Sequence, residues 1–411
     1  MISGEKSGTG YFDPSIWGFS LNDQLLYIQL VFCKEKLVFF TQQLTFVKKF
    51  AFYLQSMSWK LIPLPYAEDL ETKSILKQLP PAHAALAELK GIVQSLPNQT
   101  ILLNTLGIQE AKDSSSVENI ITTHDDLYKA NLDFEVSISP EVKEVQNYVA
   151  AMKQGFELVE KQGLLTNQTI LKIQETLEGN NAGFRKLPGT ALKNAQTGDT
   201  VYSPPQDPNE ILSLMANLEQ FINDPEMSDY DPLVKMAIIH FQFESIHPFY
   251  DGNGRTGRIL NILYLVLSGL QKLPVLYLSS HMIRNKPDYY RLLQGVRENG
   301  DWESWISYMI RGVENTAKET LVLIEELKAL MADMKTQLRD NYKFYSQELL
   351  NNLFAHPYTK IEFLVRDLGV SRITAANYLN QLAADGVLRK ERLGTGNYYV
   401  NERLFALLSS R

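Results

Sequence analysis

The residues best suited to chemistry lie in one short segment, His247–Arg258, which reads HPFYDGNGRTGR. Its glycines at 252 and 254 flank Asn253 and let consecutive backbone N–H groups turn toward one point, an arrangement that holds anions. A strongly apolar run follows and predicts a helix over residues 255–270. The start of that helix adds free N–H groups and the positive end of its dipole at the same place. The segment therefore predicts a polyphosphate site.

Charged and titratable side chains surround this turn. Arg255 and Arg258 add two fixed positive charges on the first turn of the predicted helix. Asp251 offers a carboxylate suited to Mg²⁺, which usually takes one or two carboxylates together with phosphate oxygens and waters. His247 titrates near neutral pH and follows an apolar helix predicted over residues 233–246, which a proline stops. A general base would thus stand beside the phosphates.

The same histidine allows a second interpretation. His240, Glu244 and His247 stand at i, i+4 and i+7, a spacing that could hold zinc on one helix face. No further ligand of suitable type is close, however, and a buried helix stripe has the same spacing. A glycine turn before a helix is also a weak signal alone. The coincidence of all parts within twelve residues favours phosphate binding.

The segment His247–Arg258 resembles the signature of the Fic family, which has a histidine, a proline, a phenylalanine, any residue, an acidic residue, GNGR and a further arginine. The resemblance extends over residues 58–330. Fic proteins are mostly helical and transfer AMP from ATP to a Tyr, Thr or Ser hydroxyl of a target protein. The resemblance implies a mainly α fold: a Fic-type helical core with a small β-hairpin flap, followed by a winged helix-turn-helix domain.

The resemblance also implies roles. His247 would be the base that deprotonates the incoming hydroxyl, and Asp251 would hold Mg²⁺ against the α- and β-phosphates of ATP. The turn formed by Gly252, Asn253 and Gly254 would cradle the phosphates. Arg255 and Arg258 would bind the leaving pyrophosphate. The implied partner is a protein with a hydroxyl side chain, the chain itself included. A narrower alternative keeps the fold and uses another nucleotide donor.

Two further segments match the family. The hairpin expected over Pro188–Tyr202 corresponds to the flap that aligns a target's extended chain by strand addition, although an ordinary connection has the same composition. The segment NKPDYY falls where relatives contact adenine and ribose, which implies nucleotide contacts by Asn285, Tyr289 and Tyr290.

A third match is regulatory. Ser114–Asn119, SSSVEN, resembles the family's inhibitory motif, in which a Ser or Thr, three residues and a Glu precede a Gly or Asn. Ser114 and Glu118 would then be inhibitory: Glu118 would pair with Arg258 and occupy the place of the γ-phosphate. In some relatives this glutamate also positions a water that removes AMP, so the dominant direction stays open. A plain helix cap is the alternative for the serines.

The C-terminal residues 351–411 carry eight basic and five acidic side chains. A helix over Tyr358–Asp367, a turn, a helix over Arg372–Ala384 and a hairpin predict a winged helix. This form binds DNA, although it also serves in protein contacts. A rival function follows, a transcription regulator in which the Fic core senses nucleotide and the winged helix acts on DNA.

The whole chain is mildly acidic, with 40 basic and 47 acidic side chains among 411 residues. This balance argues against a protein that coats nucleic acid. The single cysteine, Cys33, excludes an intramolecular disulfide and fits a cytoplasmic location. The apolar run Leu25–Phe40 is too short and too charged to span a bilayer, so no membrane partner is expected. A homodimer is a further expectation.

The pattern along the chain predicts five parts. The first is rich in aromatics and is either a loosely packed extension or an upstream stretch read through from an early start codon, with Met57 opening the ordinary sequence. The predicted parts are an atypical extension (1–56), the Fic N-terminal region with the inhibitory helix (57–135), the catalytic core (136–330), a helical linker (331–350) and the winged helix (351–411).

Overall fold

The computed structural model describes residues 60–96, 98–132, 138–194 and 197–410. The chain divides into two units at residue 60, and the second, residues 61–411, holds every helix and strand given below. The predictions made for residues 1–56, including Cys33, lie outside the described residues. Among those described, no helix is both long and apolar enough to cross a membrane.

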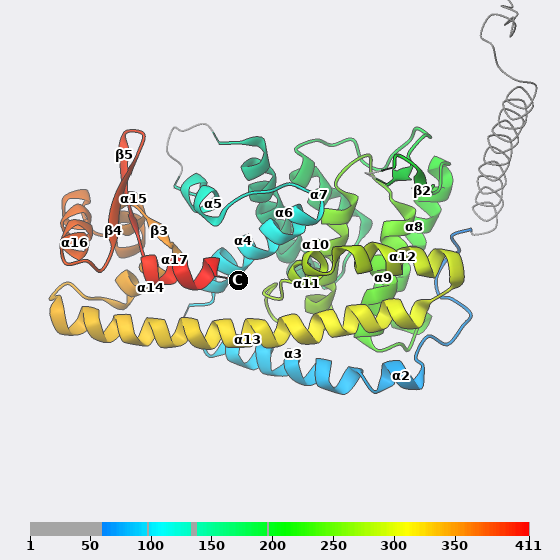
Figure 1. Cartoon of the computed structure of the whole chain (residues 1–411), viewed down its shortest axis with the longest axis horizontal. Coiled ribbons are helices and arrows are strands. Elements are labelled where there is room, and N and C mark those ends of the chain that lie inside the picture. Colours follow the sequence, from blue (N-terminus) through cyan, green and yellow to red (C-terminus); the bar gives the residue numbers. More distant parts are fainter. Residues whose placement is uncertain (1–59, 97, 133–137, 195–196, 411) are drawn as a thin grey trace, which may run out of the picture. The chain divides into compact units, whose positions relative to one another are not determined.

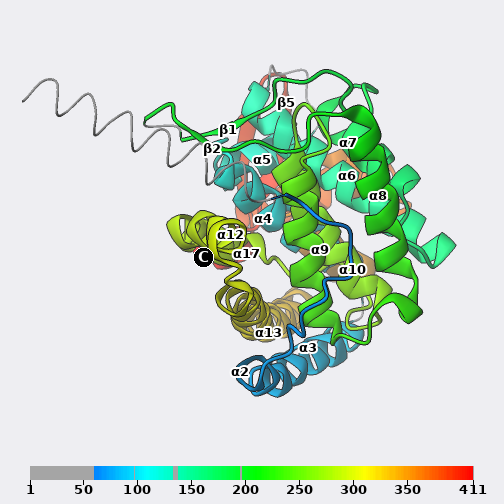
Figure 2. The ribbon, with the colours of Figure 1, turned by 90° about the vertical axis from the view of Figure 1, so that its right-hand side faces the viewer.

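Two apolar helices joined by the loop 247–252 form the centre of the second unit. Helix α9 (Pro232–Ile246) is apolar on all faces and is buried from its second residue to its last, as expected of a central helix. Helix α10 (Asn253–Leu267) packs against α9 and is buried along most of its length. Figures 1 and 2 show the helices that surround this pair: α6 (Pro140–Gln162), α7 (Asn167–Glu178), α8 (Pro208–Asn223), α11 (Ser279–Arg284) and α12 (Lys286–Asn299).

The N-terminal helices bring the predicted inhibitory segment to this centre. Helix α4 (Thr100–Val117) packs against α6 and α11 and contacts α10. Helix α3 (Leu79–Gln94) lies along the long helix α13 (Trp302–Asn341), as Figure 1 shows. Two short helices, α2 (Lys73–Leu76) and α5 (His124–Ala130), and the 3₁₀ turn η2 (Pro225–Met227) complete this part.

A short hairpin lies between α7 and α8 and confirms the predicted flap. Strand β1 (Leu192–Lys193) pairs antiparallel with β2 (Thr200–Tyr202), and the register shifts within β1. The hairpin is anchored by Tyr202, whose hydroxyl donates at 2.8 Å to the carbonyl of Ser245, the next-to-last residue of α9.

Helix α13 carries the chain from the core to the C-terminal part and runs unbroken across residue 330. Four helices and a three-stranded antiparallel sheet of order β3-β5-β4 follow. The helix predicted from Tyr358 begins only at Ile361, because Tyr358 and the next residue pair with β5. The elements are α14 (Gln347–Ala355), β3 (Tyr358–Thr359), α15 (Ile361–Leu368), α16 (Arg372–Ala384), β4 (Arg389–Leu393), β5 (Gly396–Val400) and α17 (Glu402–Ser409).

Candidate active site

His247 ends helix α9 in a left-handed backbone conformation, with φ of 48°. Its N–H donates to the Phe243 carbonyl at 2.9 Å, and its own carbonyl accepts from Arg185 Nε at 2.8 Å. Arg185 is 1% exposed and also donates through its backbone N–H to the Pro248 carbonyl at 2.8 Å. A positive φ at a non-glycine residue persists only where the surroundings fix it. Arg185, which no motif indicated, therefore holds the loop that orients His247.

The environment of His247 keeps its imidazole uncharged at neutral pH. Burial, together with the positive charges of Arg185 and Arg297, lowers the pKa of His247 to about 4. Nδ1 is buried without a hydrogen-bond partner among the described residues. An uncharged imidazole can accept a proton, as a general base must.

The turn before α10 is shaped by three residues with different tasks. Gly252 has φ of 77°, a left-handed conformation that glycine adopts without strain. The Asn253 side chain is turned back on the loop, where its Oδ1 accepts from the Phe249 N–H at 2.8 Å and its Nδ2 donates to the Phe249 carbonyl at 2.9 Å. A Cβ at Gly254 would lie 2.3 Å from Glu118 Oε1. Asn253 could therefore bind phosphate only through its backbone N–H, while Gly254 leaves room for an acidic group.

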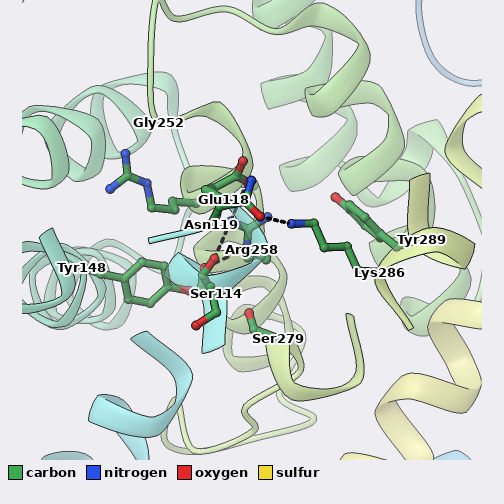
Figure 3. A network of polar contacts seen from close by, with 12 residues as sticks. Ser114, Glu118, Asn119, Tyr148, Gly252, Arg258, Ser279, Lys286 and Tyr289 are labelled. Atoms are coloured by element: carbon green, nitrogen blue, oxygen red, sulfur yellow. Dashed lines mark hydrogen bonds and ion pairs between the residues drawn. The ribbon is translucent and has the colours of Figure 1, made fainter. Parts of the chain in front are cut away.

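Arg258 is buried and is held by the end of helix α4 (Figure 3). Its side chain is 2% exposed; Nε donates to Ser114 Oγ at 2.7 Å, and Nη2 donates to the Ser114 carbonyl and to Glu118 Oε1, both at 2.9 Å. Burial acts to lower the pKa of Arg258, but the Glu118 carboxylate together with Tyr289, Tyr148 and Tyr290 outweighs it, and the pKa is raised. Nη1 is buried without a partner among the described residues. A permanent positive charge thus faces a carboxylate of its own chain and keeps one donor group unused.

Arg255 is held by a different set of partners. Its guanidinium lies 2.6 Å from Glu144 Oε2 and 3.0 Å from Glu178 Oε1, on helices α6 and α7, and its side chain is 5% exposed. Two carboxylates therefore balance its charge, and the predicted contact of Arg255 with phosphate would require at least one of them to give way. Sequence reasoning did not find these partners because they lie more than 70 positions away.

The segment Ser114–Asn119 forms the last turn of α4 and the residues just after it, so the alternative of a serine cap at a helix start is wrong. Asn119 adopts φ of 65°, the left-handed position after a helix where glycine and asparagine are preferred. Its Oδ1 accepts from Lys286 Nζ at 2.7 Å (Figure 3). The first turn of α12 is therefore hydrogen-bonded to the residue next to Glu118.

Of the three residues predicted to contact the nucleotide, two make contacts within the protein and one is exposed. Asn285 joins α11 to α12, and its Nδ2 donates to the His281 carbonyl at 2.9 Å. Tyr289 is 1% exposed, and its hydroxyl is 2.8 Å from His240 Nε2. Tyr290 is 45% exposed. Of these three side chains, Tyr290 offers the largest surface for a ligand.

The neighbours of His240 identify its stripe as a buried helix face. Its other ring nitrogen, Nδ1, is 3.0 Å from Asn261 Nδ2, and the ring stacks on Trp305 with centroids 5.9 Å apart. Both nitrogens are therefore occupied, and burial lowers the pKa of His240 to about 3. Within the described part of the chain, no group of three or more His, Cys, Asp or Glu side chains could hold a metal ion.

The fold and the site define a mainly helical protein with a glycine turn at a helix start, an uncharged histidine and an arginine occupied by an internal carboxylate. Family models match three parts of the chain: the Fic/DOC family N-terminal region at residues 76–157, the Fic/DOC family at 164–265 and the C-terminal domain of SoFic-like protein adenylyltransferase at 330–404. Residues 76–157 and 164–265 are therefore similar to the Fic/DOC family.

Curated proteins and solved structures agree with this assignment. The chain is 30% identical over 188 residues to protein adenylyltransferase Fic of Aedes aegypti, covering 46% of this chain and 36% of that protein. It is 32% identical over 110 residues to protein adenylyltransferase fic-1 of Caenorhabditis briggsae, covering 27% of this chain and 20% of that one. It therefore spans about a third or less of these relatives. A Fic family protein from Desulfovibrio desulfuricans has the same fold, with a TM-score of 0.50 and 22% identity over 82% of this chain and 98% of that chain.

Proposed function

We propose that this protein transfers AMP from ATP to a hydroxyl side chain of a target protein, itself included, and that Glu118 holds the activity low. The observation that carries the proposal is the Glu118 carboxylate 2.9 Å from Arg258 Nη2, against the glycine turn at the start of α10. A carboxylate in that place imitates a phosphate oxygen, because both bind arginine through charge-assisted hydrogen bonds. The names of the curated relatives support the reaction class.

The site fits a nucleotide polyphosphate at two places. The unused Nη1 of Arg258 supplies a buried donor, and the N-terminus of α10 supplies backbone N–H groups. In the proposed step the imidazole of His247 takes the proton from the target's hydroxyl group. The hydroxyl oxygen forms a bond to the α-phosphorus of ATP while the bond from that phosphorus to the bridging oxygen breaks, and pyrophosphate leaves.

Asp251 is the residue that would hold Mg²⁺. Its side chain is exposed next to the turn, and its Oδ1 accepts from the Gly252 N–H at 2.7 Å, which fixes the carboxylate beside the phosphate site. A single carboxylate with phosphate oxygens and waters matches the usual ligands of this ion. Bound there, Mg²⁺ would neutralise charge on the phosphates.

The inhibition follows from competition for one arginine. While Glu118 pairs with Arg258, a γ-phosphate would meet a negative charge instead of a positive one. Glu118 is 36% exposed and Arg258 is 2% exposed, so the carboxylate is the partner that can withdraw into solvent. We propose that withdrawal of Glu118 switches the site on.

The position of the label in ATP tests which group is transferred. We expect the Glu118→Gly variant with Mg²⁺ to retain label from the α-phosphate of ATP and to retain none from the γ-phosphate, because pyrophosphate is the leaving group. Gel autoradiography of protein washed under denaturing conditions makes the measurement. Label from the γ-phosphate would show phosphorylation instead. Parallel reactions with α-labelled GTP, CTP and UTP test the alternative of another donor.

We propose DNA binding by the C-terminal part as a second function. Arg372, Ile373 and Asn377 are exposed on the first turns of α16, where a recognition helix presents its side chains to bases, and Lys390 is exposed on the wing strand β4. Ile373 is 75% exposed beside these polar side chains.

A gel shift of the full chain with genomic fragments tests this second function. We expect retarded bands at about 50 mM salt that weaken strongly by about 200 mM, since phosphate contacts release counterions. The Asn377→Ala variant should lose sequence preference, and Asn351→Ala, on helix α14, is the matched control. Absence of any shift at low salt would contradict DNA binding, and nucleotide-dependent binding without AMP transfer would favour the transcription regulator.

A further inference from the structure

Helix α4 carries a stripe of three polar residues that begins deep in the core and ends at Arg258. Glu110, Ser114 and Glu118 stand four residues apart and therefore lie along one face of the helix. Glu110 is 2% exposed and Ser114 is fully buried. The family motif begins at Ser114, so Glu110 belongs to no part of the site described above.

Polar contacts connect the members of this stripe through Tyr148 on helix α6. Arg258 Nε donates to Ser114 Oγ at 2.7 Å, and the Tyr148 hydroxyl donates to Glu110 Oε1 at 3.0 Å. The Ser114 side chain acts to lower the pKa of Tyr148, whose pKa burial raises. Figure 3 shows Ser114 between Tyr148 and Arg258. A chain of polar contacts therefore connects Arg258 with Glu110.

Glu110 fixes the far end of this chain to a third helix. Ser279, the first residue of α11, donates through Oγ to Glu110 Oε1 at 2.5 Å and through its backbone N–H to Glu110 Oε2 at 3.1 Å. Ser279 and Tyr148 are both fully buried. One carboxyl group thus ties α4 to α6 and α11 one turn before Ser114.

The chemistry of this junction requires a carboxyl group. Three donors converge on its two oxygens, whereas a glutamine would offer one oxygen and turn an NH₂ group toward a donor. Burial raises the pKa of Glu110 to about 8, and the donated hydrogen bonds oppose this shift. Because a buried polar group left without its partner costs more than a formed bond gains, loss of one member weakens the whole chain.

We infer that Glu110 is a positioning residue for inhibition: with Tyr148 and Ser279 it anchors helix α4 so that Ser114 and Glu118 stay on Arg258. The inference rests on the proposed function, since inhibition has meaning only for an active enzyme. Among the described residues, Glu110 forms no hydrogen bond with Arg258 or with the glycine turn, and it acts through Tyr148 and the helix turn that carries Ser114.

Deletion of single hydroxyl groups tests the anchor. Tyr148→Phe and Ser279→Ala each remove one donor to Glu110, and Tyr308→Phe is the control because the buried Tyr308 hydroxyl has no hydrogen-bond partner among the described residues. With α-labelled ATP and full-length protein, Tyr148→Phe and Ser279→Ala should raise transfer about threefold to tenfold over wild type, and Tyr308→Phe should match wild type. Combined with Glu118→Gly, neither substitution should change the rate more than about twofold.

Hydrogen exchange of the amides in residues 110–118 gives a readout that needs no activity. We expect faster exchange there in Tyr148→Phe and Ser279→Ala than in Tyr308→Phe. If both variants transfer AMP and exchange amide hydrogens at wild-type rates, the inference is wrong. The proposed function would still stand, provided that Glu118→Gly is active. A larger effect of either substitution in the Glu118→Gly background would place the residues in the transfer machinery and would also overturn it. An inactive Glu118→Gly would refute the proposed function instead, and the exchange rates would still test the anchor.

Discussion

The Glu118→Gly variant should transfer AMP from ATP about 10-fold to 100-fold faster than the wild-type protein. The substitution removes the carboxylate that accepts from Arg258 Nη2 at 2.9 Å and returns that donor to a phosphate oxygen. A hydrogen bond between charged groups contributes about 1.5–3 kcal/mol, which corresponds to this range of occupancy at Arg258. Protein-bound label from α-labelled ATP, followed over time, gives the rate.

The conservative variant Glu118→Gln separates charge from shape. Glutamine keeps the length of the side chain and can still accept a hydrogen bond, but it carries no charge, so its rate should fall between wild type and Glu118→Gly. Equal rates for wild type and Glu118→Gly would mean that Glu118 does not restrain the site. A rate below wild type would instead assign Glu118 to the catalysis of AMP transfer.

The His247→Ala substitution in the Glu118→Gly background should lower transfer by about 10²- to 10⁴-fold, the contribution typical of a general base. At neutral pH the imidazole is uncharged because burial lowers its pKa to about 4, so it is ready to accept the hydroxyl proton. Transfer should be measured as before, at saturating ATP.

Nucleotide binding by the same variant serves as the control. The phosphates would be held by Arg258 and the turn at the start of α10, which do not depend on the imidazole, so the dissociation constant for ATP should change little. Weak binding together with lost transfer would show that the substitution damaged the site as a whole. Undiminished transfer would remove His247 from the mechanism.

The end of helix α4 is held at two points. On one side Lys286 donates to Asn119 beside Glu118, and on the other Glu110 anchors the helix one turn before Ser114. The first contact comes from α12 and the second involves α11, and both helices follow α10 in the sequence. These contacts hold the last turn of α4 in place, whereas the exposed Glu118 carboxylate can still turn into solvent, and a ligand that contacts Lys286 could favour its release.

The local part of the site could be predicted from sequence because its residues are contiguous. His247, Asp251 and the glycine turn fall within one loop between α9 and α10, so their spacing alone brings them together. The predicted helices on either side and the flap hairpin are present, but the helix predicted from Tyr358 begins at Ile361. That error arose because β3 depends on pairing with β5, about 40 residues later.

The partners that complete the site could not be predicted, because tertiary packing chooses them. Nothing near Arg255 in the sequence indicates that Glu144 and Glu178 occupy it, and no motif marks Arg185 as the support of His247. Tyr289 and its neighbour Tyr290 look equivalent in the sequence, yet helix α12 buries the first and exposes the second. Such choices depend on the rotation of a helix against its neighbours, which a short motif does not specify.

The most direct test of the central claim compares two full-length variants, Glu118→Gly and Glu118→Gly/His247→Ala, incubated with α-labelled ATP and Mg²⁺. The account predicts that label becomes covalently attached to protein in the first and falls at least about 100-fold in the second. Equal labelling of the two variants, or no labelling of either, would contradict it.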